Sequence, residues 1–503
     1  MFGYPISPIS NSRPKAMPSA SEMMIQSAAD ELTGGGANAG VWLGFKTNSM
    51  PPDKQAGTRL SDAPIIPHTQ PVGGTGSLEA AMMIERNPIK RFFKVLGPGL
   101  ITGASDDDPS GIGTYAVAGA SLGFTTLWTA LFTLPLLAVV QLTCARIGMV
   151  SGRGLAAVLR RHYSRSLLYL SVAALVVANT INAGADIGAI AAAINLLIPV
   201  PIVLMIVPIA LIILALQIWG SYRLIARTFK WLTLALFAYI GSALYAKPDA
   251  LQVLKATFIP RLSLDATFLS MLVALLGTTI SPYLFFWQAD QEVEEEISFG
   301  RETVSQRRGA SDAEIKYARW DVYIGMFLSN AVMYFIILAT AATLFKAGKT
   351  DIQSAADAAQ ALKPLAGEGA SVLFALGLIG TGFLAVPILT GSSAYAVTQA
   401  FGGRYGFNQK PRQAKLFYGV IIASTFVGML INFVGINPIK ALFLAAVING
   451  FMAPPLLVVI MLVANNRKVM RKHVNGRWAN ILGWTTTLVM FAAAVGLVLT
   501  WGD

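Results

Sequence analysis

The chain has 503 residues, of which 54% are hydrophobic and 13% are charged, and its formal net charge is +12. Soluble domains carry about 25% charged residues, so this composition excludes an ordinary soluble protein and predicts a helical protein that crosses a membrane many times. The positive charge comes without a compact basic domain or recognition motif, so we expect a lipid bilayer, and no nucleic acid, as partner. The single cysteine, Cys144, excludes an intramolecular disulfide framework.

The N-terminal segment, residues 1–85, is rich in Pro, Gly, Ser and Ala and has no sustained apolar periodicity. Such a composition predicts a disordered tail. No uninterrupted apolar stretch lies near its start, so a signal peptide is not expected.

Eleven apolar segments of about the 20 residues needed to cross a bilayer follow the tail. They lie at about 96–121, 124–149, 167–196, 200–219, 225–246, 266–289, 320–345, 371–398, 415–434, 439–464 and 479–501. With the N-terminus inside, the Lys and Arg clusters fall in the inner loops, so we expect a multi-pass protein of the cell membrane whose N-terminus is cytoplasmic. We expect residues 86–464 to form spans 1–10, and residues 465–503 to form an inner loop plus span 11.

The first span contains the most informative feature of the chain, GPGLITGASDDDPSGIGTY at 97–115. Charged residues at bilayer depth are costly and usually face a ligand, a partner or a cavity. Pro109 and Gly111 should break the helix there, and unwound backbone can coordinate ions. Successive residues fan around a helix by about 100°, so the three aspartates cannot share one site. We expect Asp108, next to the proline, to bind a cation.

The sixth span repeats this pattern, because LLGTTISPYLFFWQADQ places Ser281, Pro282 and Tyr283 inside an apolar run. Pro282 removes a backbone hydrogen bond and leaves carbonyl groups near Thr278 and Thr279 free. An ordinary proline kink is the alternative. Two breaks that lie five spans apart predict two inverted repeats, spans 1–5 and spans 6–10. Asp108 would repel a substrate carboxylate, so a metal cation or an organic amine fits this site better.

Both motifs resemble those of a known family. GPGLITGASDDDPSG resembles the first-span signature of the NRAMP divalent-metal transporters, and GTTISPY resembles their sixth-span motif Gly-Ala-Thr-Val-Met-Pro-His. The likeness covers roughly residues 90–500. It implies a LeuT-like 5+5 inverted repeat of about eleven transmembrane helices, which agrees with the span count above.

The resemblance implies a ligand set that departs from the family pattern. Asp108 and the carbonyl groups of Ser105 and Thr278 match family ligands, whereas Gly111 replaces an Asn and Ser281 replaces a Met.

Tyr283 stands where the family has a histidine that is tied to proton movement. None of the three histidines lies in a predicted span. Asp186 alone remains of an acidic pair in span three, and Asn449 is the amide nearest to a polar position of span ten. We expect further polar residues to line the approaches to the site: Asp106, Asp107, Asp186, Asp290, Glu292 and Asn449. A solvated helix end is the alternative for the acidic stretch at 288–296.

These replacements favour a harder metal. A thioether ligand favours manganese, iron and softer transition metals, and its loss removes that preference. Magnesium retains several waters and suits a roomier, oxygen-lined site. The chain therefore resembles the NRAMP-related magnesium transporters, and we expect uptake of Mg²⁺ and Mn²⁺ by alternating access without proton coupling. A proton-coupled manganese or iron importer and an amine or amino-acid carrier are alternatives. We expect no resident cofactor and no enzymatic activity; nothing in the sequence specifies the oligomeric state.

Overall fold

The computed structural model describes residues 97–220, 234–407 and 409–500. The tail predicted at 1–85 lies outside the described residues, as does the first part of the predicted fifth span. All the secondary structure of the described residues is helical.

The long helices follow the order of the predicted spans. They are α4 (Pro98–Asp106), α5 (Pro109–Leu122), α6 (Leu127–Ser151), α8 (Arg165–Leu197), α9 (Ile202–Trp219), α13 (Ala266–Thr279), α14 (Pro282–Ser298), α16 (Asp312–Thr340), α19 (Ala370–Phe401), α20 (Lys415–Ile431), α21 (Pro438–Ala464) and α23 (Arg477–Leu499). The shorter α-helices are α7 (Leu155–His162), α11 (Ala238–Tyr245), α12 (Ala250–Phe258), α15 (Val304–Arg307), α17 (Ala355–Ala359), α18 (Lys363–Ala366) and α22 (Arg467–Met470). Single turns of other helix types are η1 (Gly123–Thr126), η2 (Leu234–Phe237), the π-helix η3 (Ala341–Phe345), η4 (Gln360–Leu362), η5 (Gly367–Gly369), η6 (Asn432–Val434) and η7 (Arg471–His473).

Nine helical segments of the described residues are long and apolar enough to cross a membrane. One of them runs from α5 through η1 into α6, so it holds the second half of predicted span 1 and all of span 2. Of the predicted fifth span only η2 and α11 are described. The other predicted spans each coincide with one helix, or with the pair α13 and α14. The positions of the eleven predicted spans therefore agree with the helices that are described.

The seventh span begins earlier than the predicted residue 320. Its helix α16 starts at Asp312, because Ser311 and Glu314 form a capping box that satisfies the first backbone N–H groups. The Ser-x-x-Glu spacing was readable in the sequence, but it stands before the apolar stretch on which the prediction relied.

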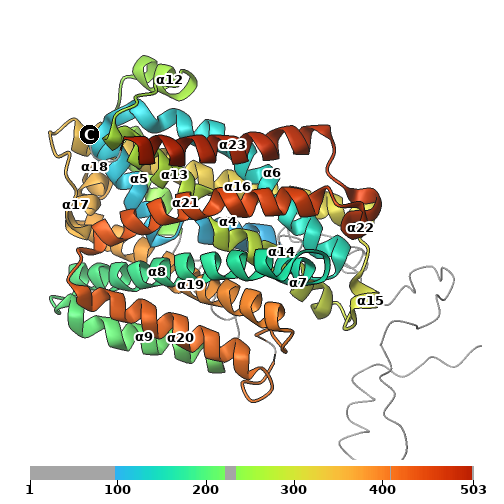
Figure 1. Cartoon of the computed structure of the whole chain (residues 1–503). Helices are drawn as coiled ribbons and strands as arrows, with labels where there is room; N and C mark the ends of the chain where they lie inside the picture. The colour runs from blue at the N-terminus through green and yellow to red at the C-terminus, as the bar shows by residue number, and fades with distance from the viewer. Residues whose placement is uncertain (1–96, 221–233, 408, 501–503) are drawn as a thin grey trace, which may run out of the picture. The chain divides into compact units, whose positions relative to one another are not determined.

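Two halves of the chain repeat the same helix contacts. In span numbers, α4 packs on α16 (spans 1 and 7) and α14 on α6 (spans 6 and 2), while α8 packs on α20 (3 and 9) and α19 on α9 (8 and 4). Each contact reappears when both spans are replaced by their counterparts in the other half of the chain (1 by 6, 7 by 2, 3 by 8 and 9 by 4), as an inverted repeat requires. Helices α8 and α19, which are spans 3 and 8, lie side by side (Figure 1).

The broken first span is fixed against α16 at close range. A Cβ atom placed on Gly103 would lie 2.3 Å from the carbonyl oxygen of Gly325, so the two helices touch backbone to backbone. The carboxylate of Asp321 on α16 accepts hydrogen bonds from the backbone N–H groups of Gly97 (3.0 Å) and Gly99 (2.6 Å). An anionic group at a helix N-terminus accepts hydrogen bonds from the free backbone N–H groups and interacts favourably with the positive end of the helix dipole. Helix α4 is therefore held at its start.

Candidate functional site

The helix of the first span is interrupted between α4 and α5 for a local reason. Pro109 is the first residue of α5, a position where its missing N–H costs no hydrogen bond, and Asp108 is the N-cap. One carboxylate oxygen of Asp108, Oδ1, accepts from the backbone N–H of Gly111 at 2.7 Å and from the Ser110 hydroxyl at 2.8 Å. The break therefore presents the second oxygen of Asp108 to the interior of the helix bundle.

That second oxygen, Oδ2, contacts two other helices. It accepts from the Asn182 side-chain amide on α8 at 2.8 Å, and the Tyr283 hydroxyl on α14 lies 3.5 Å away. The same Tyr283 hydroxyl donates to the carbonyl oxygen of Ser105 at 2.8 Å. The structure thus brings together three of the predicted site residues, Asp108, Ser105 and Tyr283. Asn182 was not predicted, although it lies four residues before Asp186 and hence on the same face of α8.

The second break lies between α13 and α14, at Ile280 and Ser281, with Pro282 opening α14. The Ser281 hydroxyl donates to the carbonyl oxygens of Gly277 (2.9 Å) and Thr278 (2.6 Å). These are carbonyl groups that the missing α-helical donors beyond the break would otherwise leave free. The Thr278 carbonyl, a predicted ligand, therefore already accepts one hydrogen bond and keeps one lone pair.

Gly111 joins the two breaks. A Cβ atom on this residue would lie 3.1 Å from the hydroxyl oxygen of Thr278 and 3.3 Å from the carbonyl oxygen of Asp106. The first turn of α5 thus faces the end of α13 without a side chain between them. The absence of a side chain at Gly111 leaves room for a ligand to reach these oxygens.

Asp106 and Asp107 point away from Asp108. The Ser329 hydroxyl on α16 donates to Asp106 at 2.5 Å and lies 3.3 Å from Asp107. This agrees with the expectation that three consecutive aspartates fan apart. The three aspartates do not form a solvated face, because none of their side chains is more than 5% exposed.

Several buried polar groups around the breaks lack a compensating partner. Asp186 is fully buried and interacts electrostatically with Asp108; the Ser110 backbone faces its carboxylate, but no side chain of the described residues donates a hydrogen bond to it. Both side-chain amide atoms of Asn449, on α21, and the Thr278 hydroxyl have no hydrogen-bond partner within the part of the chain described. Buried polar groups are normally hydrogen-bonded, and a buried charge is normally paired.

Among the described residues, no Lys or Arg forms an ion pair with these carboxylates. The salt bridges of the described residues join Arg301 to Glu296 and Glu314, and Lys472 to Asp312, all outside the breaks. The described residues also contain no group of three or more His, Cys, Asp or Glu side chains that could hold a metal ion. A cation at this place would therefore be bound by few carboxylates together with neutral oxygens.

Asp290 and Glu292, which we expected to line the approaches to the site, are covered by neighbouring residues. Asp290 accepts a hydrogen bond from Gln399 on α19, and Glu292 accepts one from Gln288 at 2.8 Å. Both side chains are buried, so the alternative of a solvated helix end is wrong for them. Glu292 nevertheless lines a small cavity of about 40 Å³ whose other acidic residues are Glu295, Glu296, Glu314 and Asp321. Asp290 does not line that cavity.

The sequence and fold of this chain match those of known proteins. The model of the family "Natural resistance-associated macrophage protein-like", Nramp, matches residues 99–500. The chain belongs to the Nramp family. Its relatives include the "Divalent metal cation transporter MntH" of Bacillus subtilis, 25% identical over 80% of this chain and 91% of the relative, and that of Deinococcus radiodurans, 28% identical over 80% and 89%.

The solved structures of other proteins show the same fold. A manganese transporter of Eremococcus coleocola superposes with a TM-score of 0.66 at 20% identity, over 83% of this Nramp chain and 90% of that one. Mhp1, a nucleobase-cation-symport-1 family transporter, superposes with a TM-score of 0.50 at 14% identity, over 80% and 93%. The prediction of an all-helical, polytopic inverted-repeat membrane protein is confirmed. The relatives are named as transporters, which agrees with the expectation that this chain is not an enzyme.

Proposed function

We propose that this Nramp protein carries divalent metal cations across the cell membrane by alternating access, and that Asp108 is the principal metal ligand. The observation that carries the proposal is a pair of helix breaks surrounded by buried carboxylates that no basic side chain of the described residues neutralises. A cation supplies that missing charge. The names of the relatives support divalent metal as the substrate.

The chemistry of the donors favours Mg²⁺, with Mn²⁺ as a second substrate. Asp108 Oδ2 accepts from the Asn182 amide N–H and lies near the Tyr283 hydroxyl, while the Asn182 amide oxygen has no hydrogen-bond partner among the described residues. The predicted carbonyl ligands are those of Ser105 and Thr278. Oxygen ligands and a limited protein contribution suit an ion that keeps part of its hydration shell. At Ser281, a hydroxyl takes the place of a soft thioether.

The same residues argue against proton coupling. A tyrosine hydroxyl does not exchange its proton near neutral pH as an imidazole does, so Tyr283 is a poor proton carrier compared with the histidine that the family has there. His162 and His473 lie at the ends of short helices away from the breaks. Downhill entry would then be driven by the inside-negative potential, which contributes about 4.6 kcal/mol per 100 mV for a divalent ion.

The acidic cavity beside Glu292 supports a route between the site and the inner side. Its negative lining would attract a cation, and its position at the start of α4 places it next to the broken first span. Arg301 pairs with both Glu296 and Glu314 at its edge, so part of that negative charge is compensated. We place the N-terminus and this cavity on the cytoplasmic side.

Uptake into proteoliposomes tests the proposal. Mg²⁺ and Mn²⁺ uptake is measured in parallel, with a pH-sensitive dye inside. We expect uptake of both ions without acidification, and loss of both with Asp108→Ala. Asp351→Ala, an exposed aspartate distant from the breaks, is the matched control and should transport normally.

The alternative is a proton-coupled manganese importer, which the names of the relatives favour. Manganese uptake with matching acidification and no magnesium uptake would establish it in place of our proposal. Normal uptake by Asp108→Ala would remove the proposed site altogether.

A further inference from the structure

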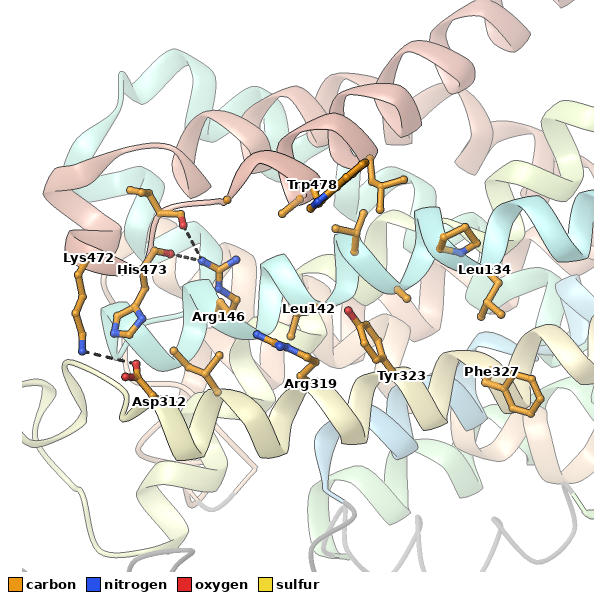
Figure 2. Close-up of a pocket in the computed structure, with 18 residues that line it drawn as sticks. Leu134, Leu142, Arg146, Asp312, Arg319, Tyr323, Phe327, Lys472, His473 and Trp478 are labelled. Atoms are coloured by element: carbon orange, nitrogen blue, oxygen red, sulfur yellow. Dashed lines mark hydrogen bonds and ion pairs between the residues drawn. The ribbon is translucent and has the colours of Figure 1, made fainter.

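A large groove lies on a different part of the molecule from the broken helices. Its volume is about 850 Å³, and it is lined by residues 134–146 of α6, 312–327 of α16, and 472–482, which lead into α23 (Figure 2). None of the residues assigned to the metal site lines it. The groove is therefore separate from the metal site.

The groove is apolar along most of its length. On α16, Ile315, Arg319, Tyr323 and Phe327 recur every four residues and so form one stripe along the helix. Opposite them on α6 stand Leu134, Pro135, Ala138, Val139 and Leu142. From Arg319 to Phe327 the stripe spans about 12 Å at 1.5 Å per residue. That length is close to one leaflet of a hydrocarbon core that is about 30 Å thick.

Positive charge gathers at one end of the groove. Three cationic side chains, Arg146, Arg319 and Lys472, line that end, and Asp312 is the one carboxylate among the lining residues (Figure 2). Lys472 lies 3.6 Å from Asp312, but both side chains are more than 70% exposed, so this ion pair is weak.

The two arginines differ in their contacts. The Arg146 guanidinium donates to the carbonyl oxygens of His473 and Val474, the latter at 3.1 Å, and so holds the loop before α23 (Figure 2). Arg319 is exposed and makes no hydrogen bond or ion pair with any described residue, while Arg146 repels it electrostatically. Arg319 therefore presents an uncompensated charge at the mouth of an apolar groove.

His473 adds no charge to this end. Burial and the neighbouring Lys472 lower the pKa of His473 below its ordinary value, with a further contribution from Arg146, whereas Asp312 and the Ala310 backbone act in the opposite sense. The imidazole is therefore mostly neutral at pH 7, and three cations face one carboxylate.

We propose that this groove binds one anionic phospholipid, with its headgroup at the basic end, its phosphate at Arg319, and an acyl chain along Tyr323 and Phe327. Charge complementarity selects an anionic headgroup, and basic pockets between spanning helices are a known setting for such lipids. Trp478 and Tyr323 also line the groove and are exposed, and exposed Trp and Tyr side chains are enriched at the headgroup level of membrane proteins. Phe327, at the other end, is 58% exposed and suits contact with hydrocarbon. An acyl chain fits that end, whereas a free phosphate ion would leave it unfilled.

Native mass spectrometry of the purified full chain tests the proposal. The protein is exchanged into detergent with phosphatidylglycerol or phosphatidylcholine of identical acyl chains, and retained lipid is counted. We expect phosphatidylglycerol to be retained preferentially, and Arg319→Gln to weaken its retention about five-fold, the usual contribution of one basic residue near an anionic lipid. Arg412→Gln removes an exposed charge from another loop, outside the groove, and should change nothing.

Two further measurements distinguish the contribution of the basic end from that of the apolar part of the groove. Ala138→Phe fills the apolar part of the groove and leaves the cations in place, so it should also reduce retention of phosphatidylglycerol. Elution of this variant as a single species shows that it is folded. Glycerol phosphate, which has no acyl chain, should not displace the lipid. Equal retention of the two lipids, an equal effect of Arg412→Gln, or displacement by glycerol phosphate would each overturn the proposal. A mass shift to a dimer in place of lipid would assign the groove to a second copy.

Discussion

Tyr283 connects the two broken helices through one hydroxyl group. It lies on α14, and its hydroxyl donates to the Ser105 carbonyl at the end of α4 while lying 3.5 Å from Asp108. The Ser105 carbonyl oxygen has two lone pairs, of which this donor uses one, so a metal that used the same oxygen as a ligand would take the other and weaken the hydrogen bond. We therefore expect removal of this hydrogen bond to change the stability of the protein differently with and without metal.

Tyr283→Phe should destabilise the metal-free protein and increase the stabilisation that metal provides. Loss of a donor to a buried carbonyl costs about 1–3 kcal/mol, and a bound cation would recover part of that cost. The measurement is the thermal midpoint in detergent without metal and with saturating Mn²⁺ or Mg²⁺.

Tyr395→Phe is the matched control for this change. The Tyr395 hydroxyl is buried and donates to Glu294 at 3.0 Å, away from the breaks. Tyr395→Phe should lower the thermal midpoint without changing the increase in that midpoint that metal produces. Identical increments in the two variants would contradict a role of Tyr283 at the metal site.

Ser281→Met should shift the metal preference towards softer ions. A thioether at this position adds a ligand that favours Mn²⁺ and Cd²⁺ over Mg²⁺, and a tenfold change in relative uptake corresponds to about 1.4 kcal/mol. Competition of Cd²⁺ against Mg²⁺ uptake in proteoliposomes measures it. Ser281→Ala removes the hydroxyl without adding sulfur, so it should not strengthen Cd²⁺ competition; if it does so equally, ligand softness is not the cause.

Sequence reasoning predicted the breaks but only part of their surroundings. Pro109 and Pro282 act within their own helices, so both breaks are visible in the chain order. Asn182 and Ser329 reach the aspartates from helices far along the sequence, and polar residues in an apolar span do not reveal which neighbour they meet. The spacing of Asn182 from Asp186 is a signal that could have been used, whereas no such signal marks Ser329.

At the scale of elements, closeness of helices depends on glycine. Gly103 of α4 and Gly325 of α16 touch backbone to backbone, and Gly277 of α13 likewise meets Gly450 of α21, where a Cβ would lie 2.3 Å from the backbone nitrogen. Without a hydrophobic driving force between helices in lipid, such small residues allow the close packing that holds spans together. The broken spans 1 and 6 are thus each fixed by a glycine contact to an unbroken helix.

Gly103→Ala should separate α4 from α16 and reduce both stability and transport. The added methyl group meets rigid backbone at 2.3 Å, so the helix must move, and overpacking costs typically about 1–3 kcal/mol. The thermal midpoint and the rate of metal uptake measure the effect.

Gly419→Ala is the control, since nothing lies within 4 Å of a Cβ placed there on α20. It should leave transport unchanged and stabilise slightly, because Ala is the better helix former. If Gly103→Ala were as neutral as Gly419→Ala, the close approach of α4 and α16 would not matter for function.

For the described part of the chain, element order was predictable because apolar length alone reveals a spanning helix. The short helices α7, α12, α15 and α17 were not predicted, since they are too short to show a hydrophobic period. The role of Asp321 was also missed, although an acidic residue within an apolar span deserves a functional interpretation. Its partners are backbone N–H groups of α4, and these leave no trace in a pattern of side chains.

At the scale of the whole membrane region, the loops sort into two sets. Helices α7, α15 and α22 lie at one end of the long helices, and α12, α17 and α18 lie at the other (Figure 1). The first end carries the basic pairs predicted for the inner side: Arg160 and Arg161, Arg307 and Arg308, Arg467 and Lys468, and Arg471 and Lys472. From the positive-inside rule we expect this end to lie in the cytoplasm.

Single-cysteine labelling can test this orientation directly, because Cys144 is the one native cysteine and is fully buried. Gln413→Cys and Thr350→Cys place exposed thiols on opposite ends, in loops that are not part of the site. In right-side-out vesicles a membrane-impermeant maleimide should label Thr350→Cys alone, and in inverted vesicles Gln413→Cys alone. The wild type should stay unlabelled in both. Labelling of the opposite thiol in each kind of vesicle would show that the protein has the inverted orientation, with the basic end outside. The membrane potential would then not drive metal entry from the Thr350 end.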